Sequence, residues 1–151
     1  MRPSLAAGGV VSRSRCRGLV VGCGYLGRRV ARSWQDCGWD VAALTRSRER
    51  AQDLERAGLA ACVGDVTDPD SLAALPAADV ALFAVGRDRE RTSQTTREIS
   101  LDGLQNVIDV LVQSNVRAIL NYAPIAARVP SNVYVRQIDP VLALQSMTYF
   151  L

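Results

Sequence analysis

The sequence predicts an α/β fold, a Rossmann-like doubly wound parallel sheet that is truncated after about five strands. Short apolar runs alternate with longer segments of helical period from residue 17 onward, which is the pattern of βαβ units. A G-x-G-x-x-G sequence stands between the first apolar run and the first helical segment. The run at 79–86 is apolar on both faces, as expected for a central parallel strand.

The composition excludes several kinds of site. Hydrophobic residues make up 48% of the chain, and no apolar run approaches the ~20 residues needed to cross a bilayer, so we expect no membrane association. All 18 basic residues are arginine; without lysine and histidine there is no Ser-His-Asp triad, no Schiff-base lysine and no histidine-ligated metal. The cysteines form no C-x-x-C pair, so we expect no metal site and reduced thiols in a cytoplasmic protein.

Residues 1–16 differ from the rest of the chain. The first 35 residues hold seven arginines and no acidic residue, and the apolar stretch at 5–11 precedes the main arginine cluster, the reverse of the order in a secretory signal. Short Arg/Ser/Gly segments do not offset their ordering entropy, so we expect a disordered leader. Aromatic residues are not interleaved with these arginines, and we therefore expect no nucleic-acid partner.

The first βα unit carries the glycine loop. A strand at 18–21 leads into Gly22, which permits a tight turn. Gly24 lets the backbone approach a pyrophosphate, and Gly27 lets helix and strand pack closely. The helix that follows, at about 25–37, offers free N–H donors at its N-terminus. The loop residues expected to contact a dinucleotide are Gly22, Gly24, Tyr25, Leu26 and Gly27.

The helix at 25–37 has an apolar face. Its residues recur at spacings of 4, 4 and 3, which is the period of an amphipathic helix packed on a sheet. Gly38 follows at the position of a left-handed C′ residue and ends the helix. The residues of this face are Leu26, Val30, Trp34 and Cys37.

The second strand, at 41–44, ends at Thr45, Arg46 and Ser47, 18 to 20 residues after Gly27. In a dinucleotide fold this position meets the adenosine ribose, where Asp or Glu accepts from the 2′-OH of NAD. Guanidinium and hydroxyl groups instead suit a 2′-phosphate, so the sequence favours NADP over NAD as the cofactor. A merely solvent-exposed Arg46 is the alternative.

The second βα unit continues the pattern. Ser47 is an expected N-cap of a helix at 48–57, which Gly58 ends, with Ala51 and Leu54 facing inward. A strand at 59–63 completes the unit.

Asp65 follows this strand, at the edge where ligands bind in doubly wound sheets. Two roles remain open for its carboxylate: it accepts from an adenine amino group, or it forms an Asx-turn. Asp68 and Pro69 are the expected N-cap and first residue of a short helix that runs through Leu75.

The apolar strand at 79–86 ends in small residues that let a ribose and phosphates approach the backbone. These residues are Ala84, Val85 and Gly86. The longest helix is expected at about 94–114, and Gly103 within it indicates close packing against a neighbour. A fifth strand is expected at 117–120.

Together these segments resemble the N-terminal half of the extended or atypical short-chain dehydrogenase/reductases, the NAD-dependent epimerase/dehydratase group. The matching stretches lie within residues 18–119 and include GCGYLGRRVA, VAALTRSRERAQDL, GDVTDPDSLAALPAADVALFAVGRDR and LDGLQNVIDVL. The resemblance implies a pyrophosphate held by Gly22, Gly24 and Gly27. It further implies an adenosine ribose near Arg46, an adenine bordered by Asp65 and Val66, and a cofactor path lined by Ala84 and Val85.

The likeness ends at the fifth strand. In the family this strand leads to a catalytic Ser or Thr, and a Tyr-x-x-x-Lys motif follows. Here the strand runs into Asn121 and Tyr122 without a serine, and no tyrosine has a lysine four residues on. The family's tyrosine needs an adjacent ammonium to lower its pKa, so we expect no catalytic residues in this chain.

The predicted organisation is a leader at 1–16, an NAD(P)-binding domain at 17–120 and an atypical tail at 121–151. The tail lacks clean periodicity and leaves no room for a sixth strand, which suggests a truncated or frame-shifted gene product. The expected function is dinucleotide binding without a complete active site; the alternatives are a non-enzymatic NADP(H)-sensing or interaction module and a nonfunctional fragment. A small-molecule or nucleotide-sugar substrate is expected only if a full-length form exists.

Overall fold

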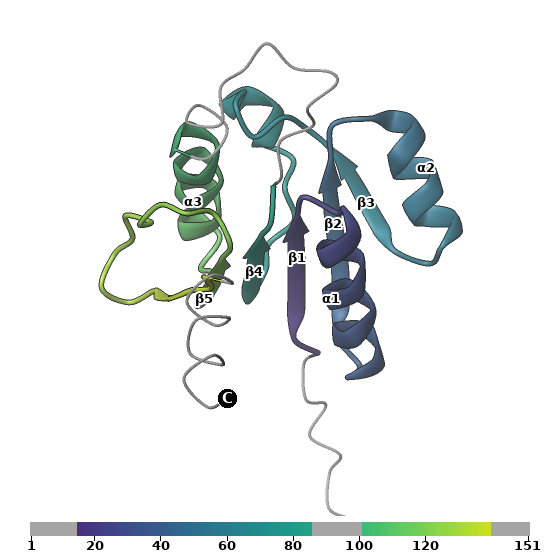
Figure 1. Cartoon of the computed structure of the whole chain (residues 1–151), viewed down its shortest axis with the longest axis horizontal. Coiled ribbons are helices and arrows are strands. Elements are labelled where there is room, and N and C mark those ends of the chain that lie inside the picture. Colours follow the sequence, from purple (N-terminus) through teal and green to yellow (C-terminus); the bar gives the residue numbers. More distant parts are fainter. Residues whose placement is uncertain (1–14, 86–100, 140–151) are drawn as a thin grey trace, which may run out of the picture.

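The computed structural model describes residues 15–85 and 101–139. These residues form one parallel sheet of six strands in the order β3-β2-β1-β4-β5-β6 (Figure 1). The order reverses between β1 and β4, which is the arrangement of a doubly wound Rossmann-like fold and confirms the predicted fold class. The strands are β1 (Arg17–Val21), β2 (Asp40–Thr45), β3 (Ala60–Val63), β4 (Val80–Phe83), β5 (Ala118–Asn121) and β6 (Tyr134–Gln137).

Helices cover the two faces of the sheet. The helices α1 (Tyr25–Asp36) and α2 (Arg48–Arg56) pack on one face, and α3 (Gly103–Gln113) packs on the other with the short 3₁₀ helix η1 (Pro69–Leu72) (Figure 1). Successive residues of β1 serve different cores: Val20 joins the cluster of α1 and α2, whereas Leu19 and Val21 join that of α3. All three are fully buried, so β1 is the centre of the fold.

Local signals in the sequence place the helix ends. The Ser47 hydroxyl accepts from the backbone N–H of Arg50 at 3.3 Å, so it caps α2 as predicted. The Asp68 carboxylate accepts from the N–H of Asp70 at 3.2 Å at the start of η1. Gly38 and Gly58 follow α1 and α2 with φ of +80° and +82°, the left-handed conformation that ends these helices.

Close packing explains the glycine with which α3 begins. A Cβ atom on Gly103 would lie 2.7 Å from Cγ2 of Val66, so a larger residue would push into the segment after β3. The Asn106 side chain also donates to the carbonyl of Val66 at 3.0 Å. These two contacts fix the position of Val66 relative to α3. The part of the predicted helix that lies at 94–100 is outside the described residues.

Asp79 joins the amino-terminal ends of three strands. Its carboxylate accepts from the backbone N–H of Arg17 at 2.9 Å and from the guanidinium at 3.3 and 3.4 Å. Its backbone carbonyl accepts from the N–H groups of Arg117 and Ala118 at the start of β5. Hydrogen bonds from Arg17 hold the pKa of the Asp79 carboxyl below its ordinary value. This residue therefore holds β1, β4 and β5 together at the edge opposite the glycine loop.

Two predictions about packing need correction. The sheet has a sixth strand, β6, paired in parallel with β5 within the segment that we expected to lack one. This strand is at the edge of the sheet, where Tyr134 and Arg136 are exposed, so it lacks the apolar run of a central strand. Cys37 is exposed rather than on the inner face of α1, because the helix ends at Asp36 and its buried residues are Gly27 and Ala31.

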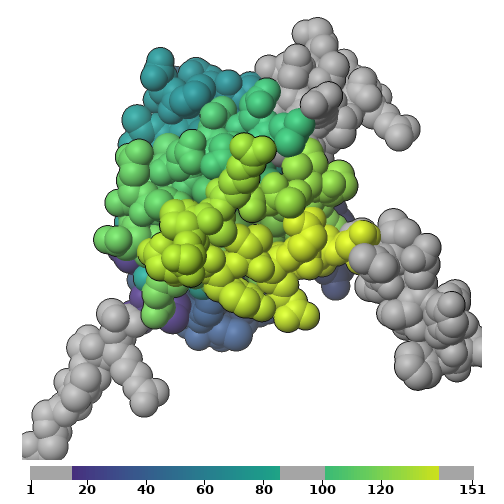
Figure 2. Space-filling view, turned by 90° about the vertical axis from the view of Figure 1, so that its left-hand side faces the viewer, coloured from purple at the N-terminus to yellow at the C-terminus, as the bar shows by residue number. Residues whose placement is uncertain are grey.

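The segment between β5 and β6 covers α3. Figure 2 shows this yellow-green segment spread over the surface next to the green residues of α3. Ala127, Val129 and Val133 pack against the core cluster of that face. The side chain of Gln105 in α3 donates to the carbonyl of Arg128 at 3.3 Å. The first part of the predicted tail therefore belongs to the core of the domain.

Candidate functional site

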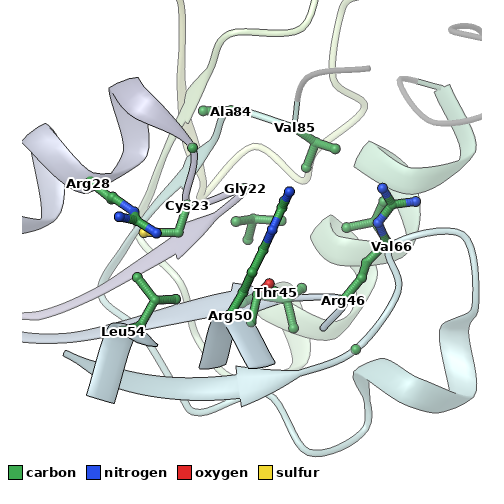
Figure 3. A pocket seen from close by; sticks show the side chains of 14 residues that line it. Gly22, Cys23, Arg28, Thr45, Arg46, Arg50, Leu54, Val66, Ala84 and Val85 are labelled. Carbon is green, nitrogen blue, oxygen red and sulfur yellow. The ribbon is translucent and has the colours of Figure 1, made fainter. Parts of the chain in front are cut away.

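A cavity of about 330 Å³ lies at the carboxyl ends of β1, β2 and β4, beside the glycine loop (Figure 3). Its size is within the range of small-molecule sites, and its place is the edge where doubly wound sheets bind ligands. Most of the residues that line it are glycines or have small or apolar side chains. The lining residues are Val21, Gly22, Cys23, Gly24, Arg28, Leu44, Thr45, Arg46, Arg50, Leu54, Gly64, Val66, Ala84 and Val85.

The glycines of the loop have different roles. Gly22 has a φ of +92°, and a Cβ atom on it would lie 2.6 Å from the carbonyl oxygen of Ala84, so only glycine fits this turn against β4. Gly27 is buried, and a Cβ on it would lie 2.9 Å from Cγ1 of Val20. Gly24 has nothing within 4 Å of the position of a Cβ. The loop is thus closed toward the protein at two glycines and open toward the cavity at the third.

Three arginines reach the cavity from different elements. Arg28 lies on α1, Arg46 lies in the turn after β2, and Arg50 lies in the first turn of α2. Figure 3 shows Arg28 next to Cys23 on the glycine-loop side, Arg46 on the side of Val66, and Arg50 extending between them. Among the described residues, no carboxylate lines this cavity. The arrangement provides a positive site for an anion, to which the N-terminus of α1 adds its partial charge.

Cys23 stands in the glycine loop but has the properties of a neutral thiol. Burial raises the pKa of the Cys23 thiol, and the nearby charge of Arg28 opposes this shift to a smaller extent. A thiol with a raised pKa is protonated at neutral pH and is a poor nucleophile. Cys23 therefore contributes to the wall of the cavity without adding negative charge.

The structure brings seven of the predicted cofactor residues together at this cavity. They are Gly22, Gly24, Thr45, Arg46, Val66, Ala84 and Val85. Gly86 is outside the described residues.

Five other predicted residues do not line the cavity. Gly27 is buried under the loop, and Leu26 is half-buried on α1. Tyr25 is 81% exposed and accepts a hydrogen bond from Arg29 at 2.9 Å. The remaining two residues, Ser47 and Asp65, use their side chains to build the local backbone.

Asp65 forms the turn that follows β3. Its Oδ1 atom accepts from the backbone N–H of Thr67 at 2.9 Å and from the Thr67 hydroxyl at 2.7 Å. Its own N–H donates to the hydroxyl of Ser71 at 2.9 Å. Of the two roles that the sequence left open, the structure shows the Asx-turn. This turn places Val66 at the wall of the cavity.

Sequence reasoning missed two of the three arginines. Arg50 precedes Leu54 by one helical turn, and Leu54 was predicted to face inward, so the spacing of four residues already placed Arg50 near that face. Arg28 directly follows the third glycine of the motif. Only the fold shows that both meet Arg46 at one cavity.

The carboxyl ends of β5 and β6 carry a different arrangement. Asn121 is fully buried; its side-chain amide donates to the carbonyl of Ile125 at 2.7 Å and to Oε1 of Gln137 at 2.8 Å, and its Oδ1 accepts from the N–H of Ala123 at 2.9 Å. The Gln137 amide in turn donates to the carbonyl of Ala123. A second cavity, of about 310 Å³, lies next to this network and includes Tyr122 in its wall. The carboxyl end of β5 is therefore occupied by an amide with a structural role.

Two further observations concern the described residues only. No helix within 15–85 and 101–139 is long and apolar enough to span a bilayer. Within the same ranges, no cluster of three or more His, Cys, Asp or Glu side chains is arranged to hold a metal ion.

A family model described as NAD(P)H-binding matches residues 22–142, from the glycine loop to beyond β6. The chain belongs to the NAD(P)H-binding family. The match begins at the first glycine of the loop and includes every residue of the arginine-lined cavity except Val21. Dinucleotide binding, which the glycine loop predicted, is thereby confirmed at the level of the family.

The similar proteins include a transcriptional repressor and a putative epimerase/dehydratase. The chain is 35% identical over 137 residues to the redox-sensing transcriptional repressor Rex of Chloroflexus aurantiacus, covering 87% of this chain and 56% of that protein. It therefore spans little more than half the length of this relative. A putative NAD-dependent epimerase/dehydratase from Methylobacillus flagellatus is similar in structure, with a TM-score of 0.58 and 27% identity over 72% of this chain and 37% of that one.

The structure of RSP in complex with β-NADH is also similar, with a TM-score of 0.60 and 21% identity, over 90% of this chain and 59% of that one. RSP has also been solved with β-NAD⁺ and operator DNA. At this identity the likeness shows the fold alone. The prediction that nucleic acid is not a partner is nevertheless wrong, because transcriptional repressors are among the similar proteins. It rested on the arginines of the leader, whereas the similarity lies in the dinucleotide-binding fold.

Proposed function

We propose that this chain is a redox-sensing module that binds a nicotinamide dinucleotide in the arginine-lined cavity. The observation that carries the proposal is the cavity itself: an open Gly24, the N-terminus of α1 and three arginines surround one space at the carboxyl ends of β1, β2 and β4. This combination suits a pyrophosphate next to an adenosine. The names of the Rex relatives support a sensing role.

Seven residues are proposed to contact the cofactor directly: Gly22, Gly24, Thr45, Arg46, Val66, Ala84 and Val85. Their positions on the cavity wall support this assignment. Gly27, Ser47 and Asp65 act on the cofactor only through the backbone that they hold in place. Thr45 and Arg46 stand where an acidic residue would accept from a 2′-OH, so we propose that NADP(H) is preferred over NAD(H).

Sensing is favoured over catalysis by the chemistry of the other half of the sheet. The chain contains no lysine and no histidine, and Asn121 at the end of β5 uses its amide for internal hydrogen bonds. By analogy with the Rex relatives, we propose that the protein is a cytoplasmic regulator of transcription. The second candidate is an oxidoreductase of the extended short-chain dehydrogenase branch, which the epimerase/dehydratase neighbour supports.

Calorimetric titration of the chain with NAD⁺, NADH, NADP⁺ and NADPH tests the proposal. A sensor must bind the reduced and oxidised forms of one cofactor with affinities that differ by about tenfold or more, because a ligand shifts an equilibrium only through differential affinity. Saturation at ~100 times the dissociation constant should raise stability by about 2.7 kcal/mol. Equal affinities for the two redox forms would contradict sensing, and steady turnover of NAD(P)H with a carbonyl substrate would support the oxidoreductase instead.

A further inference from the structure

The outward side of α1 carries an exposed tyrosine and three exposed arginines in one row. Residues at positions i, i+3, i+4 and i+7 lie on the same side of an α-helix. The opposite side of α1 packs against β1 and β2 in the core of this face. The residues of the outward row, which we call the arginine face of α1, are Tyr25, Arg28, Arg29 and Arg32.

The charge of the arginine face is not neutralised within the fold. Among residues 15–85 and 101–139, no carboxylate forms an ion pair with Arg28, Arg29 or Arg32, whereas arginines of β1 and α2 do pair with aspartates. Arg29 donates to the neutral hydroxyl of Tyr25 at 2.9 Å, and its guanidinium carbon lies 5.4 Å from the centroid of that ring. The hydroxyl of Tyr25 accepts this bond, so its own hydrogen can still be donated. The row therefore offers three positive charges and a hydroxyl donor to solvent.

The order of charges along α1 also opposes its helix dipole. A helix N-terminus carries a partial positive charge, which favours acidic residues in the first turn and basic residues in the last. The helix α2 follows this rule, with Glu49 in its first turn and Arg56 in its last. The helix α1 has neither, and its single acidic residue, Asp36, is its last. Arginines in the first two turns of α1 therefore favour an anion beside this helix.

The cavity accounts for one arginine of the three. Arg28 lines the cavity, where the pyrophosphate of a dinucleotide is proposed to bind, but Arg29 and Arg32 do not. Both are exposed on the outward side of α1. The anion that they suit therefore lies outside the cavity.

We propose that the arginine face of α1 binds the phosphate backbone of duplex DNA without reading its sequence. Arginine is suited to phosphate recognition, and tyrosine hydroxyls also donate to phosphate oxygens. Duplex DNA presents one negative charge per about 1.7 Å, and a convex helix face lacks the groove that binds a single strand. The inference extends the proposed function, because it places a DNA contact on the domain that binds the dinucleotide.

Fluorescence anisotropy with labelled duplexes of ~20 base pairs tests this contact on the whole chain. Two duplexes of unrelated sequence should bind with equal affinity. Neutralisation of three phosphates gives a slope of about −2.7 for the logarithm of the binding constant against that of the salt concentration. Affinity should therefore fall about fortyfold between ~50 and ~200 mM salt. A strong preference for one sequence, or an affinity that does not change with salt, would contradict the proposal.

A pair of double variants separates the arginine face from net charge. Arg29→Gln with Arg32→Gln should weaken duplex binding about tenfold at ~50 mM salt and reduce the salt slope by about 2. Arg128→Gln with Arg136→Gln removes the same charge from exposed positions on the β6 side of the sheet and should weaken binding less than about twofold. Equal losses in the two proteins would show that net charge alone attracts DNA, and the proposal would fall.

The variant Arg29→Lys with Arg32→Lys guards against a folding defect in the glutamine variant. Lysine also binds phosphates, as a point charge, so duplex affinity should stay within about threefold of the wild type. A loss as large as that of the glutamine variant would contradict a backbone contact.

Two competitors test the choice of partner. A single strand of the same length and a poly-glutamate peptide of equal charge should both displace the duplex poorly. Displacement by poly-glutamate as effective as by unlabelled duplex would point to an acidic protein surface and overturn the proposal, and tighter binding of the single strand would overturn the choice of duplex.

Calorimetry with NADH and NADPH on the same variants separates this inference from the proposed function. Arg29 and Arg32 lie off the cavity, so their replacement should leave dinucleotide affinity unchanged. A wild-type chain that binds a dinucleotide but no duplex removes the DNA contact and leaves the proposed function. A chain that binds duplex through α1 but no dinucleotide removes the proposed function and leaves the contact.

Discussion

In the half of the sheet formed by β1, β2 and β3, the carboxyl edge is made of glycine backbone and arginine side chains around a cavity that the end of β4 completes. In the half formed by β4, β5 and β6, the same edge carries the buried Asn121. Its side chain forms hydrogen bonds with Gln137 and with the backbone of the following segment. Both halves consist of parallel strands, which are apolar except for the edge strand β6. The two halves differ in the hydrogen-bond donors that their strand ends present to a ligand.

A strand end binds a ligand through donors that the protein does not use itself. Gly24 and the start of α1 have no side chain that caps the helix, and Arg28 and Arg46 line the cavity beside them. Asn121 and Gln137 instead satisfy each other and the carbonyl groups nearby. The carboxyl edge of the first half therefore suits ligand binding, whereas the polar side chains at the edge of the second half stabilise the fold. For this reason we favour sensing over catalysis.

The largest effect is expected at Gly22. Gly22→Ala places a Cβ at a φ of +92° and 2.6 Å from the Ala84 carbonyl oxygen, so it should lower the free energy of unfolding by about 2–5 kcal/mol and abolish dinucleotide binding. Urea unfolding and calorimetry measure the two quantities on the same sample.

Gly24→Ala is the matched variant for this glycine. Its Cβ meets nothing within 4 Å and its φ is −78°, so stability should remain within about 0.5 kcal/mol of the wild type while dinucleotide affinity falls. A loss of stability at Gly24 equal to that at Gly22 would show that the loop is merely structural, and the contrast between the two halves would lose its basis.

The next largest effect on stability is expected at Asn121, in the second half of the sheet. Asn121→Ala removes two donated hydrogen bonds and one accepted bond in a fully buried position, so it should lower the free energy of unfolding by about 2–3 kcal/mol. Dinucleotide affinity, measured below the unfolding temperature, should stay within twofold of the wild type. Asn132→Ala, an exposed asparagine in the same segment, is the control and should change neither quantity. Strong loss of affinity in Asn121→Ala would mean that β5 and β6 also take part in binding the ligand.

The same contrast explains what the sequence predicts and what it does not. The first half follows from local patterns: apolar runs of β1 and β2, the glycine loop, the cap at Ser47 and the left-handed glycines after the helices. Strand β6 lacks such a pattern because an edge strand with exposed Tyr134 and Arg136 buries few side chains. Its place depends on pairing with β5, which is a contact between distant residues.

The site was predictable to a similar extent. Motif positions such as Gly22 and Arg46 are fixed by their distance from a strand end, and they line the cavity. The contribution of Arg28 and Arg50 arises only when α1 and α2 pack on the same face of the sheet. For Asp65 the residue type allowed two roles, and its hydrogen bonds to Thr67 show the turn.

A smaller effect is expected at Asp79, at the edge opposite the cavity. Hydrogen bonds from Arg17 lower the pKa of this carboxyl, so its contribution to stability is complete well above pH 3.8 and is lost as the pH falls through the lowered pKa. Because the Arg17 side chain is half exposed, Asp79→Asn should destabilise the domain less than Asn121→Ala does. Thermal melting between neutral and acidic pH should show a shallower acid loss in Asp79→Asn than in the wild type, with affinity unchanged. An identical acid profile in the two proteins would assign the acid sensitivity to other carboxylates.

The smallest change in stability is expected at Ser47. Substitutions at this residue also test whether the adenosine ribose lies at the end of β2. Ser47→Ala removes the cap of α2 and should lower the free energy of unfolding by about 0.5–1 kcal/mol, and Ser47→Asp should restore it, because aspartate is an equally good cap. Ser47→Asp also places a negative charge between Arg46 and Arg50, so it should weaken NADP⁺ more than NAD⁺ while stability stays at the wild-type level. Equal weakening of both cofactors would place the adenosine ribose away from the end of β2, since a carboxylate beside a 2′-phosphate repels it and one beside a 2′-OH accepts its hydrogen bond.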